Sequence, residues 1–82
     1  MENTFINTRI QGKSVTDIPG IDAYYGKILA RNGFSSAQEV LTKCTSLGMD
    51  KETCKRWFMQ MEIDKFNASR AFNALDAYSR KW

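Results

Sequence analysis

The stretch DIPGID, residues 17–22, joins a proline–glycine corner to an aspartate, and apolar helix-like segments lie on both sides of it. Pro19 disfavours the α conformation at the preceding residue, so a first helix is expected to end at Ile18. Gly20 can adopt positive φ and lets another backbone approach closely. Asp22 is a preferred N-cap, so a second helix is expected to begin there. Its free backbone N–H groups and positive dipole end form a site where an anion such as phosphate can bind.

The apolar residues around this corner fit a helix-hairpin-helix motif, in which hairpin amides contact the DNA backbone without reading the bases. The apolar set spanning both flanking helices is Val15, Ile18, Ile21, Tyr25, Leu29 and Phe34. On this stretch alone, a plain turn between two packed helices explains the pattern equally well. The rest of the chain is needed to decide between the two interpretations.

Short helices separated by capping residues are expected along the whole chain. The N-terminal segment is an apolar leader that contains Phe5, Ile6 and Ile10 and is long enough for one helical turn. Ser14 or Thr16 can cap the short helix that ends near Ile18, and the second helix is expected from about Asp22 to Asn32, before a C′ glycine at Gly33. The third helix is expected to begin with a Ser36–Glu39 capping box and to end at Gly48.

Asp50 and Asp64 are expected to cap the last two helices, whose apolar residues recur at helical spacing. The inner stripes are Cys54, Trp57, Phe58 and Met61 on one helix, and Ala68, Ala71, Phe72, Leu75, Tyr78 and Trp82 on the other. This spacing favours core packing of the aromatic rings over base stacking. Tyr24 and Tyr25 are adjacent and cannot both face inward. Tyr25 fits the core, whereas Tyr24 is expected outside, where it can contact a sugar or a phosphate.

Catalytic and metal chemistry are poorly supported by the residue types present. The chain has no histidine, so a general base near neutral pH would have to be a strongly shifted carboxylate or lysine. Cys44 and Cys54 cannot complete a four-ligand zinc site, and both fall on apolar positions of helical patterns, as reduced core thiols do. We therefore predict no enzyme activity, no metal site and no cofactor.

Length and composition indicate one small globular domain with a mildly basic charge. The chain has 82 residues, 43% hydrophobic residues and a net charge of +3, which permits an anionic partner without requiring one. No signal peptide and no apolar run of membrane-spanning length is present. We expect a soluble intracellular protein without membrane insertion, in the nucleus or the cytoplasm.

The order and spacing of several short motifs resemble the barrier-to-autointegration factor family over almost the whole chain. The residues that carry the resemblance are Phe5, Val15, IPGI at 18–21, Gly26, Lys27, Leu29, GF at 33–34, Ala37, Trp57 within KRWF, and AFNAL at 71–75. The resemblance implies an all-α, compact five-helix domain over residues 1–82 that contains a helix-hairpin-helix motif. It also implies a homodimer that binds double-stranded DNA without sequence preference and bridges two duplexes in chromatin.

The resemblance places the DNA-binding residues at the hairpin and at the start of the last helix. The candidate residues are Gly20, Asp22, Ala23, Tyr24, Tyr25, Lys27, Lys65 and Asn67. Lys65 is the strongest candidate for a phosphate partner in the last helix, because it adds a charge to a second helix N-terminus.

The chain departs from the family pattern at the hairpin and at the dimer surface. Asp22 replaces a glycine and brings a negative charge close to the expected phosphate, and the family's basic, phosphorylated N-terminal tail has no counterpart. A glycine that allows close helix packing becomes Thr42, and neighbouring positions become polar at Thr45, Ser46 and Thr53. These changes predict a weaker or differently packed dimer, and they weaken the expectation of LEM-domain or lamin partners.

Two functions from different classes follow. The first is sequence-independent binding of double-stranded DNA, favoured by IPGI, Gly26, Lys27 and Lys65. The second is a protein-interaction module that keeps the helical fold without strong DNA binding, favoured by Asp22 and the modest net charge. We favour DNA binding.

Overall fold

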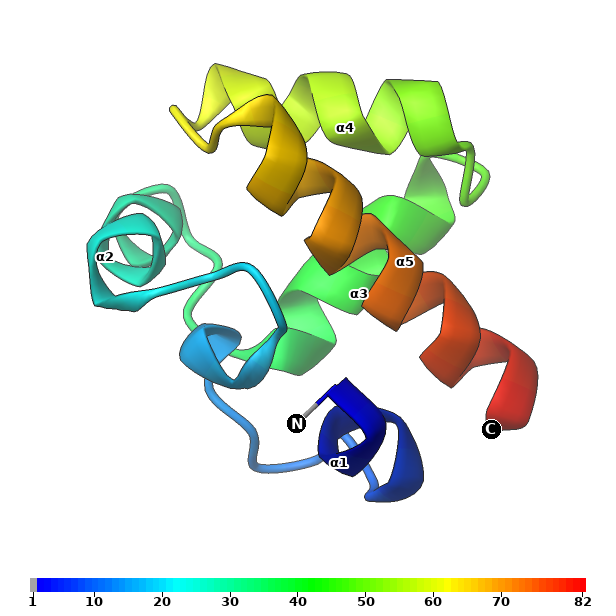
Figure 1. Ribbon diagram of the computed structural model, residues 1–82. Helices are drawn as coiled ribbons and strands as arrows, with labels where there is room; N and C mark the ends of the chain where they lie inside the picture. Colours follow the sequence, from blue (N-terminus) through cyan, green and yellow to red (C-terminus); the bar gives the residue numbers. More distant parts are fainter. Residues whose placement is uncertain (1) are drawn as a thin grey trace.

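Five α-helices and one short 3-10 turn form the computed structural model, which describes residues 2–82 (Figure 1). The elements are α1 (Glu2–Asn7), η1 (Val15–Asp17), α2 (Ala23–Arg31), α3 (Ala37–Ser46), α4 (Lys51–Gln60) and α5 (Lys65–Lys81). No β-strand occurs among these residues, and an isolated bridge pairs Ser14 with Ser36. The predicted all-α, five-helix fold is confirmed.

Helix α5 is the longest element, and it packs against α4 at one end and α1 at the other (Figure 1). Its buried face consists of Ala68, Ala71, Phe72, Ala74, Leu75 and Tyr78. Three of these six residues are alanines, whose small side chains allow neighbouring elements to approach the helix axis. The rest of the core therefore packs against the middle of α5.

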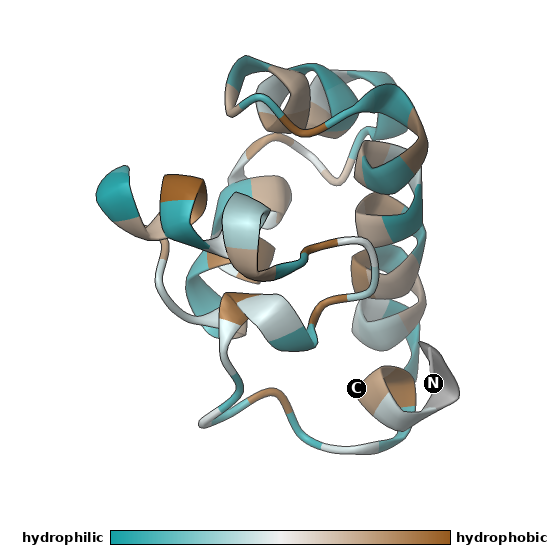
Figure 2. Ribbon diagram, turned by 60° about the vertical axis from the view of Figure 1, so that its left-hand side comes forward, coloured by the Kyte–Doolittle hydropathy of each residue, from teal (hydrophilic) through white to brown (hydrophobic). Residues whose placement is uncertain are grey.

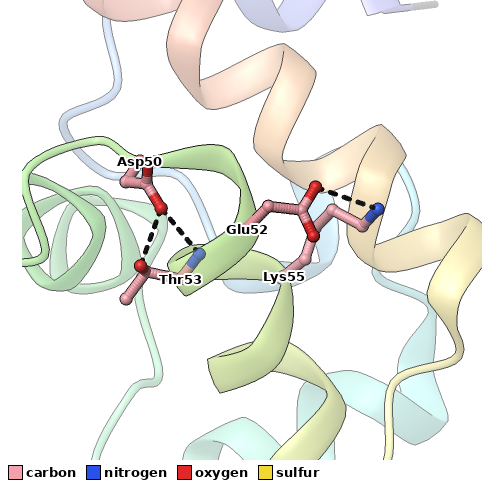
Figure 3. Close-up of polar contacts among 4 residues, drawn as sticks. All are labelled: Asp50, Glu52, Thr53 and Lys55. Carbon is pink, nitrogen blue, oxygen red and sulfur yellow. Dashed lines mark hydrogen bonds and ion pairs between the residues drawn. The ribbon is translucent and has the colours of Figure 1, made fainter.

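The N-caps of the four longer helices are those that the sequence predicts. The side chains of Asp22, Ser36, Asp50 and Asp64 each accept a hydrogen bond from a backbone N–H in the first turn of α2, α3, α4 and α5. The capping box of α3 is complete, with Glu39 accepting from the Ser36 amide at 3.0 Å. Figure 3 shows the cap of α4, where Asp50 Oδ2 accepts from the Thr53 amide at 3.0 Å and from its hydroxyl at 2.7 Å.

The element before the hairpin is a 3-10 turn of three residues, shorter than the helix that the sequence suggests. Ser14 is its N-cap, and Asp17 accepts from the Ser14 amide at 3.0 Å to complete a capping box. Ile18 is already extended, with ψ of 125°, because it precedes a proline. Only three residues fit between these two fixed points, too few for an α-helix. The fifth α-helix is instead α1, formed by the apolar leader.

The prediction that Trp82 lies on the inner stripe of the last helix is wrong. Its side chain is 50% exposed, because α5 ends at Lys81 beyond the edge of the core. The indole N–H donates to the Ile6 carbonyl at 2.9 Å, and the Arg9 guanidinium lies 4.8 Å from the ring centroid. The residue therefore connects the end of α5 to α1 from outside the core. On α4, Met61 is only half-buried, since it is the C-cap residue.

Cys44 on α3 and Cys54 on α4 are buried, free thiols, as the sequence predicts. The Cys54 thiol donates to the Cys44 carbonyl, with a sulfur–oxygen distance of 3.8 Å. Burial raises the pKa of both thiols. Because the thiolate is the reactive form, these cysteines behave as small apolar core residues.

None of the helices in residues 2–82 combines the length and the apolar composition that crossing a membrane would require.

Candidate nucleic-acid interface

The hairpin between η1 and α2 lies against α5 (Figure 2), and Gly20 packs directly on the backbone of that helix. Gly20 has φ of +92°, and a Cβ at this position would lie 2.6 Å from the Asn67 carbonyl oxygen and 3.3 Å from Arg70 Cβ. Both the backbone conformation and the available space therefore require glycine. A side chain here would displace either the hairpin or α5, so substitutions at Gly20 report on folding as well as on binding.

Two buried isoleucines anchor the hairpin on either side of the proline–glycine corner. Ile18 and Ile21 are 1% and 3% exposed, and the Ile21 amide donates to the Ile18 carbonyl at 3.0 Å. Gly26 allows α2 to lie against η1, since a Cβ there would be 2.7 Å from Thr16 Cγ2. The first turn of α2 is thus held in place by contacts on both sides of the corner.

The start of α2 leaves two backbone donors directed away from the helix. Asp22 Oδ1 accepts from the Tyr25 amide at 2.9 Å, which confirms the predicted cap. The amides of Ala23 and Tyr24 precede the first intrahelical hydrogen bond, so helix geometry gives them no acceptor within α2. Both residues are exposed, and these amides are available to an external anion.

The start of α5 is built in the same way. Asp64 accepts from the Asn67 amide at 3.1 Å and from the Asn67 side-chain amide at 2.6 Å. Asn67, which the sequence predicts to bind DNA, is half-buried and already engaged with Asp64. Lys65, at the first position of the helix, is exposed beside the N-terminus.

A hydrogen bond between Tyr25 and Asp64 fixes these two helix starts relative to one another. The Tyr25 hydroxyl donates to Asp64 Oδ1 at 2.8 Å and accepts from the Asp64 amide at 3.4 Å. Bonds from the Asn67 side chain, the Tyr25 hydroxyl and the Asn67 amide lower the pKa of the Asp64 carboxyl group. The bond to Asp64 raises the pKa of the Tyr25 hydroxyl. Each shift favours the form in which tyrosine is neutral and aspartate is charged.

A groove of about 400 Å³ runs between the hairpin and α5. It is lined by Thr16, Asp17, Ile18, Pro19, Gly20, Ile21, Asp22, Asn67 and Arg70. Its charged groups are two carboxylates and one guanidinium, so the groove itself is not a basic channel. The predicted cations Lys27 and Lys65 are exposed on α2 and α5, and neither lines the groove.

The structure brings most of the predicted residues to one side of the molecule. Gly20, Asp22 and Asn67 line the groove, and Tyr25 reaches Asp64 from the first turn of α2. Tyr24 is 61% exposed, as predicted. The groove also contains Arg70, which the sequence analysis did not select, although it lies three residues after Asn67 on the same side of α5.

Arg31 is a second cation that the sequence analysis did not select. It is exposed one turn after Lys27 on α2, so the two side chains point in similar directions. The i, i+4 spacing of two exposed cations after the hairpin is the signal that could have identified it. Among residues 2–82, no three acidic, cysteine or histidine side chains gather in a way that could hold a metal ion.

The whole chain, residues 1–82, matches a protein-family model described as "SAM_BAF: Barrier to autointegration factor". No curated protein matches the chain.

Replacing Tyr25 with phenylalanine tests the bond between the two helix starts. We expect the pKa of Asp64, followed by NMR, to rise toward its ordinary value, because the variant lacks one of the donors that stabilise the carboxylate. A carboxyl group with a lowered folded-state pKa stabilises the fold above its unfolded-state pKa, near 4, and loses this effect as the pH falls through the folded-state value. The stability difference between wild type and Tyr25→Phe should therefore shrink on acidification.

Tyr24→Phe is the matched control, since the Tyr24 hydroxyl lies 3.5 Å from Glu62 and makes no bond to Asp64. An unchanged Asp64 pKa in Tyr25→Phe, or a stability difference that is constant with pH, would contradict this role for the bond.

Proposed function

The chain belongs to the barrier-to-autointegration factor family, and on this basis we propose that it binds double-stranded DNA through the phosphate backbone, without sequence preference. We propose further that residues 1–82 act as a single domain of this family, without enzymatic activity, in the nucleus or the cytoplasm. The motif at the hairpin acts as a helix-hairpin-helix element whose first helix is reduced to a 3-10 turn.

The pairing of two helix N-termini beside one hairpin carries this proposal. The starts of α2 and α5 are joined by the Tyr25–Asp64 bond of 2.8 Å, and Gly20 packs on α5 at Asn67 and Arg70. Each start offers first-turn amides and the positive end of a helix dipole. Phosphate oxygens accept hydrogen bonds from such amides whatever the base, which supports binding that is independent of sequence.

Three exposed cations on the same two helices can add phosphate contacts to those of the amides. Lys65 stands at the start of α5, and Lys27 and Arg31 follow one another along α2. Each cation that neutralises a phosphate releases condensed counterions from the DNA, which contributes to affinity independently of sequence.

A protein-interaction module without strong DNA binding is the second candidate function, and the carboxylates around the hairpin favour it. Asp17 and Asp22 line the groove, and Glu62 and Asp64 lie where α4 leads into α5. These four negative charges are close to the amides that would bind phosphate. A partner protein with basic side chains would be attracted to the same surface.

Binding to two unrelated duplexes over a series of salt concentrations tests the DNA-binding proposal. We expect equal affinities for the two sequences and a steep fall of affinity with salt, by about 0.9 log unit per log unit of salt for each neutralised phosphate. Lys65→Gln should lower this slope by about 0.9, because it removes one phosphate contact. Electrophoretic mobility shift or fluorescence anisotropy can measure the slopes.

Lys51→Gln is the matched control for Lys65. Lys51 is also an exposed first helical residue after an aspartate N-cap, but it lies at the start of α4, away from the hairpin. It should leave the slope unchanged. A preference for one duplex, or a lack of binding at low salt, would contradict the proposal and favour the interaction module.

Asp22→Gly separates the cap from the charge at the hairpin. Glycine is an acceptable N-cap, so the variant should lose only a few tenths of a kcal/mol of stability, whereas Asp22→Ala should lose about 1 kcal/mol. Asp22→Gly also removes a carboxylate next to the proposed phosphate, so DNA affinity should increase. Thermal unfolding and DNA titration measure the two effects separately. Unchanged affinity would indicate that the hairpin is only a turn.

We also propose a homodimer that uses the exposed side of α3 and bridges two duplexes. A groove of about 370 Å³ on this side is lined by Gly33, Phe34, Gln38, Glu39, Thr42, Lys43 and Ser46. The hydroxyls of Thr42 and Thr45 donate to carbonyls one turn earlier on α3, at 2.9 Å each. Since these donors are already satisfied, burying them costs less than burying unpaired hydroxyls. Their bulk still favours a weaker or differently packed dimer, and we do not extend the proposal to LEM-domain or lamin partners.

Light scattering over a wide range of concentrations tests the dimer. We expect dissociation on dilution, and we expect Thr42→Arg to shift the equilibrium toward monomer, because it places a charge and bulk on the exposed side of α3. Gln11→Arg adds the same side chain in an exposed loop and should have no effect. A strict monomer at high concentration would contradict both the dimer and bridging by it.

A further inference from the structure

Two exposed aromatic side chains occupy equivalent positions at the two helix starts. Tyr24 and Phe66 are each the second residue after an aspartate N-cap, Asp22 in α2 and Asp64 in α5. Tyr24 is 61% exposed and Phe66 is 70% exposed. The two helices whose starts lie elsewhere carry polar residues at this position, Gln38 in α3 and Glu52 in α4.

The fold does not account for the position of Phe66. On α5 it lies opposite the face of Ala68, Ala71 and Leu75, and phenylalanine has no preference for the first turn of a helix. Trp82 differs, because its indole N–H donates to Ile6 and its ring packs on Tyr78 and Arg9. Among the described residues, Phe66 has no such ring contact. Its exposure is therefore a feature of the surface beside the helix start.

A ligand that suits this surface must combine an anionic group with a flat apolar face. First-turn amides and Lys65 can bind the anionic group, and the exposed rings of Tyr24 and Phe66 can stack on the flat face. In duplex DNA the base faces are stacked on one another, and only sugar edges lie next to the phosphates. In single-stranded DNA each base offers a free π-face close to a phosphate, and stacking on aromatic side chains is a general mode of binding.

We propose that Tyr24 and Phe66 stack on unpaired bases, so that the chain binds single-stranded DNA as well as duplex DNA. This proposal rests on the proposed phosphate binding at the starts of α2 and α5. The same phosphate site serves both ligands, and the aromatic pair contributes only when bases are unpaired. Single-stranded ends or melted regions of duplex DNA are then the preferred targets on a long molecule.

Titration with an oligothymidylate and with a duplex of equal length tests the aromatic pair. Phe66→Ala and Tyr24→Ala should each weaken binding to the oligothymidylate by at least about fivefold, the lower end of measured stacking effects. Phe66→Ala should change duplex affinity by less than about twofold, because paired bases are not available to its ring. Phe66→Tyr keeps a ring and should retain single-strand binding, whereas Phe66→Leu keeps apolar area without a π-face and should lose it.

Met59→Ala is the matched control, since Met59 is an exposed apolar residue, 46% exposed, on the neighbouring α4. It should change neither affinity, and circular dichroism should show that all variants fold. Duplex binding without single-strand binding, or equal losses for both ligands in Phe66→Ala, would overturn the aromatic pair and leave the proposed function intact. A lack of binding to either ligand would overturn the proposed function, and the aromatic pair with it.

Discussion

The close approach of Gly20 to the backbone of α5 is the contact on which the arrangement of this small molecule depends. The chain has neither a sheet nor a disulfide among its described residues, so its segments are held by side-chain packing and by a few close backbone contacts. A Cβ at Gly20 would lie 2.6 Å from the Asn67 carbonyl oxygen, so the hairpin can pack this closely on α5 only with glycine at position 20. Once it docks, Ile18 and Ile21 enter the core on either side, and the start of α2 is placed beside the start of α5. The Tyr25–Asp64 bond then fixes the two helix starts, and the same packing therefore stabilises the fold and forms the candidate site.

Capping and anion binding compete for the same backbone groups at these helix starts. An aspartate N-cap stabilises its helix by accepting from the amide at the third position, as Asp22 and Asp64 do. In α2 the first two amides, those of Ala23 and Tyr24, have no acceptor within the helix, and they are the ones that an incoming phosphate can reach. Each cap also leaves a carboxylate close to that phosphate. The Asp64 carboxylate accepts bonds from Asn67 and Tyr25, whereas among the described residues the Asp22 carboxylate accepts only from the Tyr25 amide. Asp22 is therefore the carboxylate with the greater influence on an anion at the hairpin.

The features that the sequence predicts well are those determined over a few residues. The four caps, the capping box at Ser36 and Glu39, and the positive φ of Gly20 and Gly33 depend on local chemistry, and the structure confirms them. The 3-10 turn and the exposure of Trp82 were missed for a different reason. The first depends on how little chain separates Ser14 from Pro19, and the second on where the core ends along α5. Tyr25 and Asp64 are 39 positions apart, so nothing in the local pattern could predict their bond. The DNA-binding residues remain a prediction, and the bond from Asn67 to Asp64 shows that Asn67 has a structural role in any case.

Two opposing energies act on a phosphate at the hairpin, the repulsion by the Asp22 carboxylate and the hydrogen bonds from backbone amides. A carboxylate about 6 Å from a phosphate repels it by roughly 0.7 kcal/mol in bulk water and by about 3 kcal/mol at the effective dielectric constant of a protein surface. A hydrogen bond from an amide to a charged acceptor contributes about 1.5–3 kcal/mol. The exposed Asp22 lies near the solvent limit of the repulsion, and the two first-turn amides of Ala23 and Tyr24 act on the attractive side before any lysine is counted. The amides of Ala23 and Tyr24 alone therefore offset the charge of Asp22. For an anion at the hairpin, the repulsion by Asp22 is thus smaller than the attraction by these two amides, which supports the proposed binding of phosphate.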